Sequence, residues 1–216
     1  MAGASTNRFG GNALMLGGFL FTIAIFLHPD ISSLERAGAA SLGLWNFVHW
    51  AYLFGDVLLI AGLLMLFRHL AASGTGASEG WAAVALAGGF TGFALDVATT
   101  GIHLFSFPPV LPASTPNLAN IFDAAYAANN GIGGGGLFVA DVALVALGMA
   151  LKKDGWSAAV VYVAMAVGAL ELLLSAYSSM TGNWLVPAGM ASLVVSALMP
   201  LGYSFVGFSF AQRGAK

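Results

Sequence analysis

The stretch WNFVHWAYLFGD, from Trp45 to Asp56, places a histidine and an aspartate inside an apolar run long enough to cross a lipid bilayer. His49 and Asp56 are seven residues apart, which corresponds to about 700° of helical rotation. Both side chains therefore lie on one face of the expected helix, with Tyr52 between them. Ionisable side chains at membrane depth are costly, and they are tolerated mainly where they pair with each other or line a cavity. The stretch predicts a polar site inside a membrane helix.

The composition of the whole chain is typical of an integral membrane protein. Of the 216 residues, 59% are hydrophobic and 7% are charged, whereas a soluble domain carries about 25% charged residues. The mean hydropathy of +0.88 agrees with this class. A net charge of -2 without a basic run gives no indication of a nucleic-acid partner, and the absence of cysteine excludes disulfides and thiolate ligands. The length fits one transmembrane bundle domain covering residues 1–216.

Six apolar segments are long enough, or nearly long enough, to span a bilayer. We expect them at Gly10–His28, Leu44–Phe67, Trp81–Phe105, Gly133–Leu151, Trp156–Ser178 and Trp184–Phe210. Pro200 should kink the sixth segment, because proline removes a backbone donor and clashes with the preceding turn. The sequence thus predicts an all-α polytopic membrane protein with six transmembrane helices in one bundle, in contact with the lipid bilayer.

The longest connection, between the third and fourth segments, contains a further helix signal. Thr115 and Pro116 suit the cap and the first residue of a helix, and apolar residues then recur at helical spacing. We therefore expect a short amphipathic helix at Asn117–Asn130 in this loop, lying on the membrane or capping the bundle. The five glycines in Gly131–Gly136 then form either a hinge or a surface for close helix packing.

The distribution of basic residues predicts the orientation of the bundle. With six spans, both termini and the second and fourth loops share one side of the membrane. That side holds Arg8, Arg68, Lys152, Lys153, Arg213 and Lys216. The other side holds only Arg36. The positive-inside rule therefore places both termini in the cytoplasm of a multi-pass protein of the cell (inner) membrane.

The polar pattern of the second segment recurs on the third. Asp96 and His103 are again seven residues apart, and the two helices are consecutive and antiparallel. We therefore expect His49 to lie near His103, and Asp56 to lie near Asp96.

Two further segments carry an acid at a similar expected depth. Asp141 lies eight residues inside the outer end of the fourth segment, and Glu171 lies seven residues before the outer end of the fifth. At about 1.5 Å per residue, all four acids are expected roughly 10–18 Å below the outer surface. His28 is expected at that surface, at the end of the first segment. Because no lysine or arginine is expected among these residues, charge on the acids must be neutralised by protons or by a cation. The set predicts one outward-facing pocket.

One interpretation of this pocket is a cofactor or metal site. His49 and His103 are suited to ligate a haem axially, with Tyr52 beside it. Imidazole and carboxylate groups are equally suited to a divalent transition metal. The ligands of such an ion would be drawn from His49, His103, Asp56, Asp96 and His28.

A second interpretation is acid–base catalysis on a small lipophilic ligand. A buried neutral acid can protonate a substrate while a second carboxylate accepts a proton. The candidate catalytic residues are Asp56, Asp96, Asp141 and Glu171.

Two other classes of function remain open at this level. Intramembrane acids also mark proton or cation paths in transporters. In an accessory subunit of a larger membrane complex, or in a homo-oligomer, the same polar residues would only form hydrogen bonds between helices.

The predicted topology can be tested with reporter fusions. Fusions at the C-terminus and between Ser73 and Gly80 should report a cytoplasmic location, and fusions near Ser114 should report the outside. A C-terminus on the outer side would contradict six spans and the expected depths of the acids.

Overall fold

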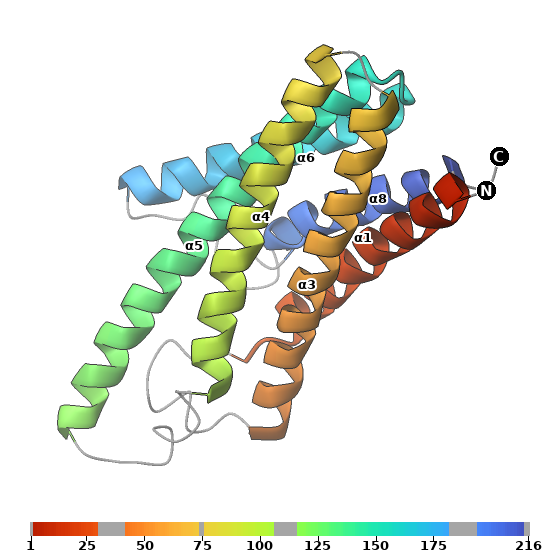
Figure 1. Ribbon diagram of the computed structural model, residues 1–216. Helices are drawn as coiled ribbons and strands as arrows, with labels where there is room; N and C mark the ends of the chain where they lie inside the picture. The colour runs from red at the N-terminus through yellow and green to blue at the C-terminus, as the bar shows by residue number, and fades with distance from the viewer. Residues whose placement is uncertain (1, 30–41, 74–75, 106–115, 182–193, 214–216) are drawn as a thin grey trace.

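The computed structural model describes residues 2–29, 42–73, 76–105, 116–181 and 194–213, and these ranges are helical apart from short turns. The long helices (Figure 1) are α1 (Ala2–Leu27), α3 (Leu42–Ser73), α4 (Gly76–Phe105), α5 (Pro116–Lys153), α6 (Ala158–Thr181) and α8 (Leu198–Arg213). Six described helical segments, the last beginning at Val194, are long and apolar enough to cross a membrane. The predicted all-α class with six apolar helices is therefore confirmed, whereas the orientation of the bundle stays a prediction.

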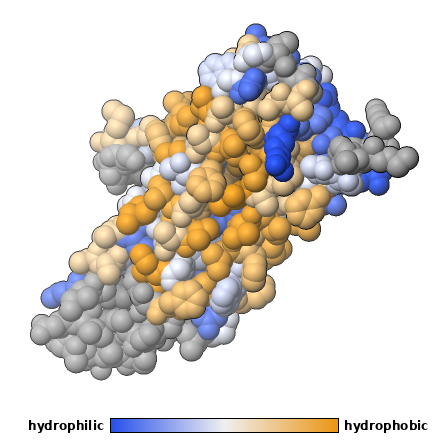
Figure 2. All heavy atoms as spheres, in the orientation of Figure 1, coloured by the Kyte–Doolittle hydropathy of each residue, from blue (hydrophilic) through white to orange (hydrophobic). Residues whose placement is uncertain are grey.

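The helices pack in a closed ring. α1 contacts α3 and α8, α3 contacts α4, α4 contacts α5, α5 contacts α6, and α6 contacts α8. The first turns of α1 and the last turns of α8 lie side by side at one end of the bundle (Figure 1). Hydrophobic residues dominate the flank seen in Figure 2, as lipid contact requires.

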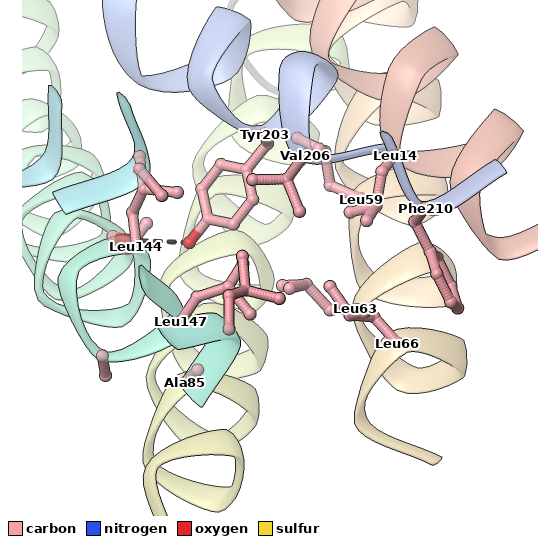
Figure 3. Close-up of a cluster of buried hydrophobic side chains, with 14 of the residues drawn as sticks. Leu14, Leu59, Leu63, Leu66, Ala85, Leu144, Leu147, Tyr203, Val206 and Phe210 are labelled. Atoms are coloured by element: carbon pink, nitrogen blue, oxygen red, sulfur yellow. Dashed lines mark hydrogen bonds between the residues drawn. The ribbon is translucent and has the colours of Figure 1, made fainter. Parts of the chain in front are cut away.

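An apolar core fills the half of the bundle nearer the termini. Figure 3 shows leucines of α3 and α5 meeting aromatic residues of α8. Tyr203 is fully buried in this core, and its hydroxyl donates a hydrogen bond to the Ala140 carbonyl at 2.9 Å. The core is lined by Leu14, Leu59, Leu63, Leu66, Leu144, Leu147, Val206 and Phe210.

The fourth spanning helix differs from the expectation. A single helix, α5, runs from Pro116 to Lys153, so the segment Asn117–Asn130 is helical but is not a separate loop helix. No proline follows Pro116 in this range, and a membrane-spanning backbone must satisfy its hydrogen bonds within the helix. The helix therefore continues through the glycine run.

The glycine run is helical, and two of its residues, Gly133 and Gly136, lie against α4. A Cβ atom on Gly136 would lie 2.8 Å from the carbonyl oxygen of Gly92, and one on Gly92 would lie 2.6 Å from the carbonyl oxygen of Gly136. The backbones of α4 and α5 are therefore in direct contact, as small residues in membrane helices permit.

The sixth span carries the predicted disturbance at Pro200. Residues 194–196 are helical, but the regular helix is interrupted by a turn at Ala197 before α8 begins. Pro200 has no N–H to donate to the Ser196 carbonyl, and its ring crowds that group. The expected start of this span, Trp184 to Pro187, lies outside the described residues, as do Arg36 and the loop residues Ser106 to Thr115.

A pair of substitutions within the glycine run tests the contact between α4 and α5. Gly136→Ala should lower stability by about 1–3 kcal/mol, because the new methyl group forces the two backbones apart. Gly134→Ala is the matched control: Gly134 is exposed, a Cβ there meets nothing within 4 Å, and the melting temperature should be unchanged or slightly higher. Equal melting temperatures of the two variants in detergent would contradict this packing.

Candidate metal centre

Three histidines converge at the end of the bundle opposite the termini. His28 follows the last residue of α1, His49 lies in the second turn of α3, and His103 lies in the last turn of α4. One ligating atom from each ring can be chosen so that all three atoms lie within 4.8 Å of one another. The expected contact between His49 and His103 is present, with 3.0 Å between His49 Nε2 and His103 Nδ1.

Backbone carbonyl groups orient two of these rings. His49 is fully buried, and its Nδ1 donates a hydrogen bond to the Trp45 carbonyl at 2.7 Å. His28 Nδ1 donates to the Pro29 carbonyl at 2.9 Å. Because a carbonyl oxygen can only accept, both rings carry their proton on Nδ1 and keep a lone pair on Nε2. Burial lowers the pKa of His28, which favours the neutral imidazole that a metal ion requires.

Asn129 holds the third ring from α5. Its Nδ2 donates to His103 Nε2 at 2.8 Å, and His103 Nδ1 donates in turn to His49 Nε2. The hydrogen bonds thus run in one direction, from Asn129 through the two imidazoles to the Trp45 carbonyl. The Asn129 Oδ1 atom is buried and has no hydrogen-bond partner among the described residues.

Trp45 packs the histidines together and links α3 to α4. Its ring centroid lies 4.3 Å from that of His49 and 5.6 Å from that of His103. Its Nε1 donates to the His103 carbonyl at 2.9 Å, and the side chain is fully buried. The sequence alone does not identify Trp45 as a site residue, and it places Asn129 only near the rim of the expected pocket. Trp45 shares the face of His49 at a spacing of four residues, but Asn129 reaches the site only because α5 is continuous.

The first carboxylate pair lies about two turns deeper. Asp56 is fully buried, and neither of its carboxyl oxygens has a hydrogen-bond partner among the described residues. Its side chain interacts with Asp96, as expected from the spacing. Asp96 is partly exposed, and its Oδ1 accepts a hydrogen bond from Thr99 Oγ1 at 3.4 Å. Gly133 of α5 faces this pair of side chains, since a Cβ there would lie 3.7 Å from Asp96 Oδ1.

Tyr52 lies between the histidines and this pair. Its ring centroid is 6.0 Å from that of His28 and 6.2 Å from that of His49. Its phenol group also interacts electrostatically with Asp96 and Asp56. The predicted placement of Tyr52 beside the histidines is therefore observed, and the residue joins the two polar groups.

Asp141 and Glu171 form a second, separate pair between α5 and α6. The two side chains are buried and interact with each other, and each has one oxygen without a hydrogen-bond partner in the described chain. Gly133 and Gly136 of α5 lie against Asp96 of α4. Asp141 follows Gly136 by five residues, so it lies further from the histidines than Asp96 does.

The four acids therefore form two pairs at different levels, about 7–8 Å of helix apart. The expected depth of Asp141 takes Gly133 as the outer end of the fourth span. In the structure, α5 already reaches the histidines at Asn129, four residues earlier.

Axial ligation of haem by His49 and His103 is wrong. The two imidazoles are in direct hydrogen-bonding contact, with ring centroids 4.7 Å apart. A porphyrin cannot lie between rings that touch, and haem needs its two axial ligands on opposite faces of the ring.

No protein-family model, no curated protein and no solved structure matches this chain. Its function is therefore inferred from the chemistry of the site.

Two substitutions distinguish Asp56 from a polar residue that stabilises the fold. Asp56→Asn removes a carboxyl group with no hydrogen-bond partner, so the melting temperature should be unchanged or higher. Tyr203→Phe removes the hydrogen bond to Ala140 and should lower stability by about 0.5–1.5 kcal/mol. Thermal unfolding in detergent compares them, and a larger loss for Asp56→Asn would show that Asp56 is structural.

Proposed function

We propose that this multi-span membrane protein binds a divalent transition-metal ion at His28, His49 and His103. The observation that carries the proposal is the convergence of the three rings, with ligating atoms within 4.8 Å of one another. Imidazole is a good ligand for Zn²⁺, Cu²⁺, Ni²⁺ and Fe²⁺. Histidine ligands are usually oriented by hydrogen bonds from their second nitrogen to carbonyl or carboxylate groups, as the Trp45 and Pro29 carbonyls do here.

The distance between the ligating nitrogen atoms of His49 and His103 is close to the distance that a tetrahedral metal site requires. Metal–nitrogen distances of about 2.0–2.1 Å in a tetrahedral site place two ligand atoms roughly 3.4 Å apart. The 3.0 Å between His49 Nε2 and His103 Nδ1 needs only a small separation of the rings to reach this value.

Asn129 is suited to support the metal-bound form of His103. A metal ion at His103 Nδ1 requires the ring proton to reside on Nε2 instead. Asn129 now donates to that Nε2, but its Oδ1 is buried without a partner. Rotation of the amide would present Oδ1 as the acceptor for the new Nε2–H. An amide can serve both tautomers because it carries a donor and an acceptor.

Three protein ligands leave a coordination position open, which is typical of catalytic rather than structural zinc sites. Such a position takes water or a substrate oxygen, and a bound metal ion would polarise that group. We therefore assign to this site acid–base chemistry on a small lipophilic molecule that enters from the histidine end of the bundle. Asp56 and Asp96 are deeper than the first coordination sphere, so we place them outside the ligand set.

The packing below the site favours a binding site over an ion path. Beyond Asp56, α3 presents Leu59, Leu63 and Leu66, all buried in the apolar core (Figure 3). A proton or cation path needs polar groups or water along its length. Transport is therefore less well supported than binding at the histidine end.

The metal content of purified protein tests the proposal. After incubation with zinc or cobalt, wild-type protein should retain roughly one ion per chain, and His49→Ala and His103→Ala should retain almost none. Cobalt also allows ligation to be followed by its visible absorption. Asn129→Leu should bind about 10–100-fold more weakly, because it removes the group that orients His103.

His69→Ala is the matched control, because His69 lies on α3 near Phe210, at the other end of the helix. It should bind metal like the wild type. If the wild type binds no ion and His49→Ala melts early, the three histidines form a structural network and the proposal fails.

A further inference from the structure

We infer that the pair Asp56 and Asp96 carries one exchangeable proton, and that the pair releases it when a metal ion binds to the three histidines. This inference rests on the proposed function. It adds a second binding site, for a proton, at the level two turns below the metal.

The environment of the pair requires a proton. Asp56 is fully buried, its two carboxyl oxygens have no hydrogen-bond partner among the described residues, and Asp96 is its interacting neighbour. Two carboxylates at short range in a low-dielectric interior cannot both ionise without a counter-charge. In the absence of a cation, one carboxyl group therefore keeps its proton.

The neighbouring helices supply no such counter-charge at this level. Tyr52 and Thr99, on the same two helices, are neutral, and α5 presents Gly133. On the remaining side, α1 presents the apolar Phe21 beside Gly55 and Tyr52. The next basic residue along α3 is Arg68, twelve residues beyond Asp56, which corresponds to about 18 Å of helix. A cation must therefore come from outside the pair, and the histidine site is the near candidate.

A metal ion at the histidines is close enough to change the charge of the pair. Asp56 follows His49 by seven residues, or about 10 Å of helix. A charge of +2 at that distance weakens proton binding on the order of a hundredfold in a medium of effective dielectric constant near 20. Tyr52 fills the space between the two sites.

The step balances in charge and in protons. Before binding, the pair carries one O–H bond and a charge of -1; on binding, that bond breaks and the proton is released to solvent. The resulting charge of -2 neutralises the divalent ion. The three imidazoles are hydrogen-bonded as neutral rings, so they release no proton themselves.

The number of protons released per metal ion tests the inference. Zinc chloride is added to purified protein in detergent without buffer, and protons are measured with a pH indicator at several starting pH values. Wild-type protein should release roughly one proton per bound ion at the pH of greatest release. Asp56→Asn and Asp96→Asn should each bind zinc but abolish this release.

Asp141→Asn is the matched control, because it removes a buried acid from the other pair. Asp141 follows Asn129, at the histidine level, by twelve residues, or about 18 Å of helix. This variant should release protons as the wild type does.

The possible outcomes separate the two proposals. If wild-type protein binds no zinc, both the proposed function and this inference fail. If zinc binds without proton release, only the inference fails. Release that persists in both Asp56→Asn and Asp96→Asn would assign the proton to zinc-bound water or to histidine, and release that is lost in Asp141→Asn would assign it to a wider network. Either result would overturn the assignment to Asp56 and Asp96.

Discussion

The direct contact between the backbones of α4 and α5 at Gly92 and Gly136 sets the register on which the polar site depends. Because no side chains separate the two helices there, neither helix can slide along the other without a backbone clash. The same register places Gly133 against Asp96 and Asn129 against His103. A displacement of one turn would leave His103 without its amide partner and would fill the space beside Asp96.

Polar side chains in this bundle fall into two groups with different physical roles. Tyr203, Ser78 and Ser204 each donate a hydrogen bond to a backbone carbonyl of another helix, which satisfies them and ties the helices together. Asp56, Asp141 and Glu171 are buried with at least one oxygen that has no hydrogen-bond partner among the described residues. Buried groups without a partner lower stability, so these acids do not hold the helices together as the first group does.

The histidine cluster and the first carboxylate pair complement each other in charge. Three neutral imidazoles can hold an ion but cannot neutralise it, whereas two buried acids can neutralise an ion but lie too deep to bind it directly. Tyr52 contacts both groups and separates them. Beneath them, α3 continues with the buried leucines Leu59, Leu63 and Leu66 of the apolar core. A metal site with an adjacent proton store is the arrangement most consistent with these contacts.

The sequence by itself determined the properties that depend on local periodicity. Composition and the length of the apolar runs determine the membrane class and the six helices. The seven-residue spacing on two consecutive antiparallel helices determines that His49 meets His103 and that Asp56 meets Asp96, because helical rotation places each pair on one face. These features need no knowledge of how distant helices pack.

Only the tertiary structure decided which residues from other helices complete the site. The sequence names His28 among five candidate ligands, and the position of α1 beside α3 and α4 brings it to His49 and His103. The support from Asn129 and the separation of Asp141 and Glu171 into their own pair depend on where α5 and α6 lie. The sequence gives no correct depth for Asp141, because the glycine run resembles a break in the helix and the span is expected to begin there. In the folded bundle those glycines are the surface on which α5 packs against α4, so the helix continues and the register is set by contact between the two backbones.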